Sequence, residues 1–291
     1  MEIILVLSDE KGKNVLFVLD NLRALALTEA IALVKKEKVS GVHLVEGPTG
    51  TYLRANPNAK KEDNLDLIST PLSSLTQISM KEKTALAVSK YSRCRRQFLK
   101  EREAAGEKVI YVDGKRKKTE REIIDYLSIY KKYILAAARD LKVDKYLLGA
   151  ILIDEDLRRD WQDDLGDWLV ILGRNTTVGV AQVQVETARD LIKRNFYNPN
   201  PKDRRIAPSN ISKTPRRDLY KYLDNPKHSI YFAAGKINQI RNDFSSKFEV
   251  DKPEIIGDLY SGTTPLSLSQ ATKRGKQIAT ELYLIARKVL R

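Results

Sequence analysis

The sequence predicts an α+β protein, in which a small β-rich N-terminal domain precedes a mostly α-helical domain. Two observations carry this prediction. Short apolar runs separated by turn-forming residues dominate residues 1–70, whereas apolar residues at helical spacing dominate residues 119–291. With 291 residues, of which 42% are hydrophobic, the chain is long enough for two domains with sizeable cores.

The N-terminal domain is expected to be a compact β-β-α-β-β unit. Short apolar runs predict strands at residues 2–7, 15–19, 42–45 and 51–54. Thr28 is placed to cap a helix that runs from Glu29 to Glu37. The segments Thr28–Ile31, Tyr52–Pro57 and Asp63–Asp66 resemble a small bacterial domain of uncharacterised function. A targeting or docking role follows only by elimination, and the Asn and Asp residues serve equally well as turn formers.

Residues 71–118 are predicted to form a basic linker that contains a helix. Within them, residues 80–118 hold 13 lysines and arginines against 5 acidic residues, which is over half of the net charge of +14. A short strand and turn are expected at 109–115. Clustered positive charge is typical both of a solvated connector and of a surface that contacts polyanions, and the sequence favours neither.

The remainder, residues 119–291, is predicted to be helical. Thr119 and Glu122 form a capping-box pattern at the start of a helix that ends near Leu141. An apolar helix is expected next at 145–155. Further helices are predicted at residues 186–195, 215–223, 228–247, 253–260 and 268–290.

Cysteine and histidine are too scarce for several kinds of site. The only cysteine is Cys94, and the two histidines are His43 and His228, so neither a disulfide nor a zinc site is expected. We expect no metal and no cofactor. The N-terminal run lacks the basic start of a signal peptide, and no apolar run approaches the roughly 20 residues of a membrane span. The protein is therefore expected to be synthesised in the cytoplasm.

Glu155 is the strongest candidate for a catalytic group. It follows the apolar residues Leu147, Leu148, Ile151 and Leu152, which form one face of the predicted helix. Low-dielectric surroundings penalise a carboxylate and raise its pKa, as a general acid for glycosidic cleavage requires. The alternative is that residues 154–159 form a solvated, charged turn.

Two further segments carry candidate substrate-binding residues. Gly179 and the small Ala181 allow close backbone approach to a ligand, and Gln182 and Gln184 offer amides suited to sugar hydroxyl and N-acetyl groups. Tyr260 ends an apolar helix, so that its hydroxyl is expected to face a groove.

Taken in order, these segments resemble the lysozyme-like fold of bacterial lytic transglycosylases and goose-type lysozymes. The resemblance covers roughly residues 120–291. It depends on Glu155 and on the segments 179–182, 187–188, 229–234 and 259–262. It implies that Glu155 protonates the oxygen between N-acetylmuramic acid and N-acetylglucosamine and then acts as a base, towards the sugar's own 6-hydroxyl in a transglycosylase or towards water in a lysozyme.

The chain departs from that family in three places. Asp156 follows the glutamate where the family has Ser, and Ser261 stands where it has Asn. Residues 160–168 form an acidic insert with both tryptophans. Its carboxylates offer a second acid and its indoles offer a sugar platform, although an amphipathic surface segment explains them equally well. These candidates are Asp163, Asp164, Asp167, Trp161 and Trp168.

The sequence therefore predicts a peptidoglycan-cleaving glycosidase that acts on glycan strands at the cell wall or in the periplasm. Without a signal peptide, its delivery is expected to depend on a secretion machine or a phage particle, and a delivered toxin would have an immunity protein as partner. The alternative is a non-enzymatic protein that binds nucleic acid or cell-wall glycan.

Overall fold

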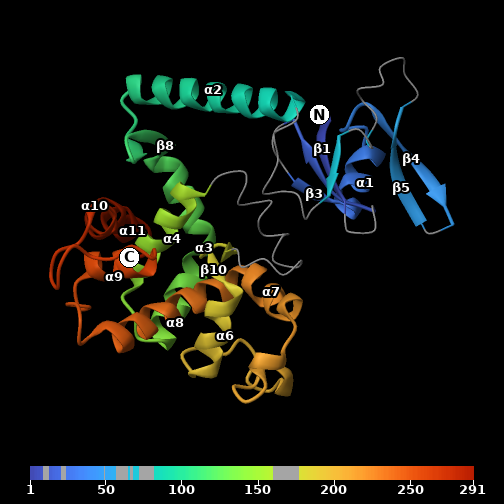
Figure 1. The fold of residues 1–291 in the computed structure, drawn as a ribbon. Coiled ribbons are helices and arrows are strands. Elements are labelled where there is room, and N and C mark those ends of the chain that lie inside the picture. The colour runs from blue at the N-terminus through green and yellow to red at the C-terminus, as the bar shows by residue number, and fades with distance from the viewer. Residues whose placement is uncertain are drawn as a thin grey trace. The chain divides into compact units, whose positions relative to one another are not determined.

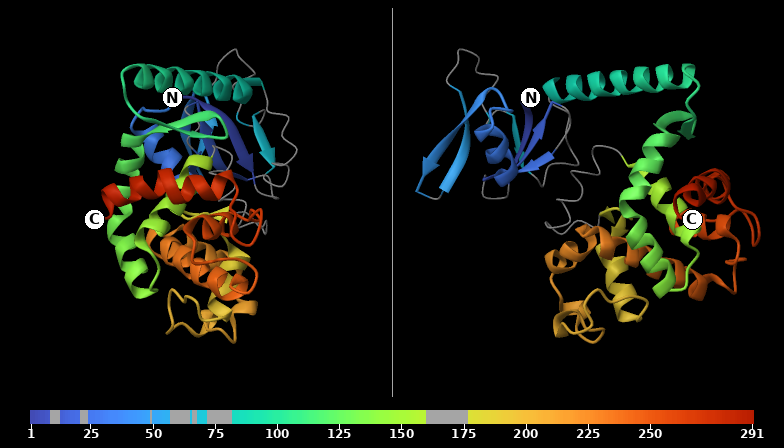
Figure 2. Two further views of the ribbon diagram at one scale, coloured as in Figure 1. Left: turned by 90° about the vertical axis from the view of Figure 1, so that its left-hand side faces the viewer. Right: turned by 180° about the vertical axis from the view of Figure 1, so that it is seen from behind.

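The computed structural model describes residues 1–8, 13–20, 24–48, 50–56, 65, 68–71, 82–159 and 177–291 (Figures 1 and 2). The chain divides into two compact units, Met1–Lys100 and Glu101–Arg291. Helices and small sheets together make a mixed α+β protein, which is the predicted class.

A four-stranded sheet forms the centre of the N-terminal unit. Its strands are β1 (Ile3–Ser8), β2 (Asn14–Leu19), β3 (Ala24–Ala26) and β6 (Ser69–Pro71), in the order β3-β2-β1-β6. The strands predicted at 2–7 and 15–19 are confirmed as β1 and β2, which pair in antiparallel orientation, and β6 pairs with β1 in parallel. The sequence did not predict β3 and β6, because three residues are too few to show an alternating pattern.

Helix α1 (Leu27–Lys35) packs against β2 and β3 and also against the hairpin of β4 (Val42–Gly47) and β5 (Gly50–Ala55). The hairpin confirms the strands predicted there. The prediction that Thr28 caps α1 is wrong, because the helix begins at Leu27, two residues before the expected Glu29, and its cap is Ala26. Strand β3 leads directly into the helix, and the carboxylate of Glu29 accepts the backbone N–H of Ala26 at 3.0 Å.

The basic segment contains α2 (Glu82–Ala104), which is followed by an antiparallel hairpin of β7 (Val109–Val112) and β8 (Lys115–Thr119). Strand β7 and the turn after it were predicted, whereas β8 was not. Glu103 accepts hydrogen bonds from the Tyr111 hydroxyl at 2.6 Å and from Arg116 Nε at 2.8 Å. These bonds fasten the hairpin to the last turn of α2.

Helix α3 (Glu120–Asp140) begins with the capping box that the sequence predicts. Thr119 Oγ1 accepts the backbone N–H of Glu122 at 3.2 Å, and the Glu122 carboxylate accepts the backbone N–H of Thr119 at 2.8 Å. Both donors would otherwise lack partners at a helix start. Ile123, Leu127 and Ile134 are buried along one face of α3.

The other predicted helices of this unit are found within three residues of their expected bounds. They are α4 (Lys145–Arg158), α6 (Val185–Lys193), α7 (Arg216–Asp224), α8 (Pro226–Phe244) and α9 (Pro253–Tyr260). Short elements join them, namely the hairpin β9 (Thr177–Val178) and β10 (Val183–Gln184) and the 3₁₀ turns η4 (Arg204–Ile206) and η5 (Ile211–Lys213).

The prediction of the final helix, 268–290, is wrong at its N-terminal end. Instead of beginning at residue 268, it begins with α10 (Lys273–Gln277), continues as a π-helical turn, η6 (Ile278–Leu282), and ends as α11 (Tyr283–Val289). The backbone of Gln270 exchanges hydrogen bonds with Leu266 and Ser267, which closes a turn before the helix. Thr272 then caps α10 through its hydroxyl.

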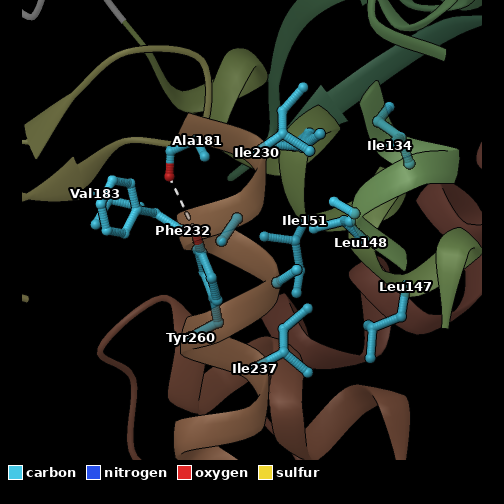
Figure 3. Close-up of a cluster of buried hydrophobic side chains, with 14 of the residues drawn as sticks. Ile134, Leu147, Leu148, Ile151, Ala181, Val183, Ile230, Phe232, Ile237 and Tyr260 are labelled. Atoms are coloured by element: carbon cyan, nitrogen blue, oxygen red, sulfur yellow. Dashed lines mark hydrogen bonds between the residues drawn. The ribbon is translucent and has the colours of Figure 1, made fainter. Parts of the chain in front are cut away.

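Helix α4 lies at the centre of the C-terminal core and packs against α3, α9, η6 and α11. Its residues Leu147 to Asp154 are all buried, which is typical of a helix surrounded by others. Figure 3 shows Leu147, Leu148 and Ile151 of this helix among side chains from its neighbours. In the described part of the chain, no helix combines the length and the apolar character needed to cross a membrane.

Candidate active site

The candidate site is built around the last turn of α4. Asp144 caps the start of the helix by accepting the backbone N–H groups of Tyr146 and Leu147 at 2.7 and 3.3 Å. The buried apolar run that follows fixes the helix in the core. The helix continues one turn past the expected end at 155, and Asp154 and Glu155 lie within it. The alternative of a solvated turn at 154–159 is therefore wrong.

Glu155 is mostly buried, with 16% of its side chain exposed. Burial raises its pKa from the usual 4.5 to about 7. Arg274, Lys236 and Arg158 oppose this shift, and the charge of Asp154 adds to it. The nearest cation is Arg274, whose Nη2 lies 3.3 Å from Glu155 Oε1. A carboxyl group with this pKa exists in both protonation states near neutral pH.

Asp154 behaves quite differently from its neighbour. Its side chain is 1% exposed and accepts hydrogen bonds from Arg158 Nε at 3.0 Å and from Arg274 Nη2 and Nε at 2.6 and 2.8 Å. Arg158 also donates to Asp113 at 2.8 Å. A buried carboxylate needs such partners, because an uncompensated charge in the interior is costly. Asp154 is therefore a structural anion that orders the last turn of α4.

A second buried carboxylate positions Arg274. Asp258 of α9 accepts the backbone N–H groups of Thr272 and Gly275 at 2.6 and 2.8 Å, and also the Thr272 hydroxyl. These bonds fix the start of α10. Gly275 is required there, because a Cβ would lie 2.2 Å from the carbonyl oxygen of Glu254. Asp258 thus holds the backbone that presents Arg274 to α4.

Lys236 of α8 is another cation that acts on Glu155. Its ammonium donates to the carbonyl oxygen of Tyr260 at 2.7 Å and lies 4.1 Å from the centre of the Tyr260 ring. Burial lowers the pKa of Lys236, and the negative charge of Glu155 opposes that shift. Besides burial, the charges that act on the pKa of Glu155 are therefore those of Arg274, Asp154 and Lys236, in decreasing order, and a smaller one from Arg158.

Lys236 also lines a hollow of about 370 Å³ between α6, α8 and α9. The volume lies in the lower part of the range typical of ligand pockets, roughly 300–1,000 Å³. Its other polar lining residues are Glu186, Thr187, Asp190, Gln239 and Asp243. The hollow offers hydrogen-bonding groups beside a cation that interacts with Glu155.

The turn between β9 and β10 is organised by contacts within the protein. Gly179 has a φ of +72°, and a Cβ at this position would lie 2.1 Å from the carbonyl oxygen of Leu223. The backbone N–H of Ala181 donates to the buried Ser229 hydroxyl at 3.1 Å. Gln182 donates to the Gly179 carbonyl at 2.8 Å and accepts from Thr177 at 2.6 Å.

These contacts correct the expected roles of three candidate residues. The close approach at Gly179 is to the protein's own backbone, Ala181 is fully buried, and the amide of Gln182 is engaged within the turn. The three residues shape the turn, and its internal hydrogen bonds occupy the Gln182 amide and the Ala181 backbone N–H. Gln184 is only partly buried and precedes α6 directly, so that it remains a candidate.

Tyr260 does not direct its hydroxyl into a groove as expected. The residue is 3% exposed, and its hydroxyl donates to the Ala181 carbonyl oxygen at 3.0 Å, as Figure 3 shows. This bond joins the end of α9 to the β9–β10 turn. Tyr260 instead presents its ring face and its carbonyl oxygen to Lys236.

The two acids that flank Glu155 have different partners. Asp156 accepts a hydrogen bond from Lys118 at 2.6 Å, and the acid that raises the pKa of Glu155 is Asp154. Asp163, Asp164, Asp167, Trp161 and Trp168 lie outside the described residues.

Three members of the site escaped sequence reasoning, namely Asp154, Lys236 and Arg274. Arg274 lies 119 residues beyond Glu155, so that only the folded chain brings the two together. The only sequence signal is the adjacency of Asp154 to Glu155, and only the alternative interpretation, a charged turn at 154–159, gives Asp154 a place.

Comparison with known proteins adds no further constraint on the site. No protein-family model matches the chain, and no curated protein matches its sequence significantly.

Proposed function

We propose that the C-terminal unit is a glycosidase that cleaves peptidoglycan between N-acetylmuramic acid and N-acetylglucosamine, with Glu155 as general acid and base. The observation that carries the proposal is the surroundings of Glu155, a mostly buried carboxyl group whose pKa is about 7. Such a group holds a proton near neutral pH and can also release it, as both halves of glycosidic cleavage require.

The reaction would begin with proton transfer from Glu155 to the glycosidic oxygen as the bond to the sugar breaks. The carboxylate left behind is stabilised by Arg274 at 3.3 Å and by the positive field of Lys236. In the second half, Glu155 would take the proton of the attacking hydroxyl group. That hydroxyl belongs to water in a muramidase and to the 6-position of the same sugar in a lytic transglycosylase.

The arrangement of polar groups favours a single-acid route. Asp154 is bound by two arginines and is almost fully buried, which leaves it poorly placed to act as a nucleophile. The carboxylates of the hollow beside Lys236, namely Glu186, Asp190 and Asp243, all pair with arginines. A second carboxylate without such a partner would have to come from the insert that holds Asp163, Asp164 and Asp167. Without one, attack by a group of the substrate itself is the simpler chemistry.

The fold supports the same interpretation. A buried helix ends at the acid, a tight turn with a positive-φ glycine leads into α6, and the end of α9 closes the cluster. This order of elements supports our proposal that the C-terminal unit has a lysozyme-like fold. The hollow beside Lys236 is proposed as part of the glycan groove, with Gln184 and Thr187 on the same turn–helix segment.

Purified sacculi incubated with the protein test this proposal. The wild type is expected to release muropeptides, and Glu155→Gln, which keeps the shape but cannot donate the proton, is expected to release none. Asp156→Asn is the matched control, because it removes an adjacent carboxylate that is bound to Lys118. Mass spectrometry of the products identifies the acceptor, since anhydro ends lack one water relative to reducing ends.

Two results would overturn the proposal. One is release that persists in Glu155→Gln. The other is a wild-type protein that sediments with sacculi and releases nothing, which would make the chain a glycan-binding protein.

A further inference from the structure

A second basic segment lies in the C-terminal unit, later in the sequence than the basic linker. Residues 202–221 contain seven lysines and arginines against two aspartates. Six of these cations are exposed, namely Lys202, Arg204, Arg205, Lys213, Arg217 and Lys221. Three of them surround a shallow hollow of about 290 Å³, which we call the basic hollow; its lining residues are Arg204, Arg205, Asn210, Lys213, Thr214 and Pro215.

The backbone beneath the basic hollow is fixed by buried anchors. Ile206 and Ile211 are buried in the core of the unit. Arg189 of α6 donates through its two terminal nitrogens to the carbonyl oxygens of Ile211 and Thr214, the latter at 2.6 Å. These two bonds therefore hold the backbone of the segment at both ends of η5.

Two side chains of the basic hollow hold the backbone of Arg204 and Arg205 in place. Asn210 Nδ2 donates to the carbonyl oxygen of Arg204 at 2.9 Å, and the Thr214 hydroxyl donates to that of Arg205. Cations presented by a fixed backbone lose less conformational freedom when they bind a ligand. The hollow is thus a pre-arranged group of positive charges.

The positive charge in the hollow is only partly compensated. Among the described residues, Arg204 and Lys213 have no acidic partner within ion-pair distance. Arg205 is bonded to Asp203 at 2.8 Å, but its side chain is 74% exposed. Exposed pairs of this kind contribute little stability, so that Arg205 can turn to another anion at small cost.

We propose that the basic hollow binds the phosphodiester groups of an anionic wall polymer of the poly(glycerol phosphate) type. Guanidinium groups offer paired N–H donors that match phosphate oxygens, and the lysine adds a point charge. The lining residues include no aromatic side chain, so that the basic hollow itself has no platform for stacking nucleobases. The rings of Tyr222 and His228 line a separate hollow, which shares only Arg205 with it. A polymer with a charge on every repeat and no bases fits this chemistry better than nucleic acid.

Binding to soluble poly(glycerol phosphate) tests the proposal without any need for catalytic activity. The double variant Arg204→Glu and Lys213→Glu reverses two exposed charges whose side chains make no ion pair with a described residue, so that folding should be preserved. The control variant, Lys247→Glu and Lys276→Glu, makes the same change in net charge at exposed positions of α8–α9 and α10. It therefore corrects for general attraction.

The wild type and the control are expected to bind the polymer with affinity that falls as salt rises, whereas the hollow variant should bind roughly tenfold or more weakly. Circular dichroism of both variants checks that they fold. Equal weakening in the two variants would overturn the proposal, because net charge alone would then explain binding. Binding of single-stranded DNA as tightly as the polymer, lost in the same variant, would also overturn it.

Discussion

Arg274 donates from both Nε and Nη2 to the same oxygen of Asp154, at 2.8 and 2.6 Å, although the two residues lie 120 positions apart. This pairing explains why two consecutive carboxylates on α4 have different characters. Asp154 receives the shorter bonds and stays a buried anion. Glu155 receives only a 3.3 Å contact from the same guanidinium, and burial dominates its pKa. One arginine thus gives two neighbouring carboxyl groups different surroundings.

Replacing Arg274 with methionine should destabilise the C-terminal unit by about 3 kcal/mol, because it leaves the buried Asp154 with Arg158 as its remaining partner. Urea unfolding at pH 7 measures the loss. The control is Lys276→Met, which changes an exposed cation of the same short helix and should alter stability by less than about 0.5 kcal/mol. If the two variants proved equally stable, Arg274 would not be neutralising Asp154.

The pKa of Glu155 makes stability depend on pH in a defined direction. Between pH 4.5 and about 7 the folded protein keeps a proton on Glu155 that the unfolded chain has released. The free energy of unfolding therefore falls as pH rises through this window, by about 1.4 kcal/mol per pH unit and roughly 3 kcal/mol in all.

Unfolding of the wild type and of Glu155→Gln at several pH values between 4 and 8 measures this contribution. Their difference isolates Glu155 from the other titrating groups. The glutamine variant should gain stability relative to the wild type as pH rises, and a difference that stays constant across the window would refute the raised pKa.

The features that the sequence could predict depend on residues that are close together in the chain. The capping box of Thr119 and Glu122 involves residues three apart, and the structure reproduces it. The burial of Glu155 followed from apolar residues one and two turns earlier on the same helix. In both cases the helical repeat alone fixes which side chains are neighbours.

What the sequence could not predict depends on contacts between distant segments. Arg274 reaches Glu155 only because Asp258 fixes the start of α10. The Tyr260 hydroxyl turns inward because the Ala181 carbonyl, 79 residues away in the sequence, accepts its proton. Thr28 has the right chemistry for a cap, but strand β3 continues into the helix before it. Tertiary packing decides each of these outcomes.

Two glycines with nearly the same φ offer a test of the β9–β10 turn. Gly179 and Gly262 have φ values of +72° and +73°, but only Gly179 has backbone within reach of a Cβ, at 2.1 Å from Leu223. Gly262→Ala should lower the free energy of unfolding by about 1 kcal/mol, because alanine is strained in the left-handed backbone region and meets no other atom there. Gly179→Ala should cost more than about 3 kcal/mol, because the turn must also move away from α7.

Thermal and urea unfolding of the two alanine variants measure this difference. Equal losses would mean that the turn tolerates displacement, and the contact between Gly179 and Leu223 would then contribute nothing. A larger loss in Gly179→Ala would show that the turn which leads into α6 is rigidly placed.

Lys236→Met should raise the pKa of Glu155, because it removes a positive charge that stabilises the carboxylate. A higher pKa keeps the acid protonated to higher pH, so that the alkaline limb of the rate–pH profile for glycan release should move upward. Carbon NMR of labelled glutamate carboxyl groups follows the same titration without any need for activity.

Lys247→Met is the matched control for this last change. It removes an exposed lysine near the end of α8, and the titration of Glu155 should not move. Because burial is the larger influence on Glu155, the pKa in Lys236→Met should rise only modestly above the value of about 7. A pKa that fell in Lys236→Met would mean that the loss of the ammonium admits water to Glu155, and that Lys236 acts by sealing the site rather than by its charge.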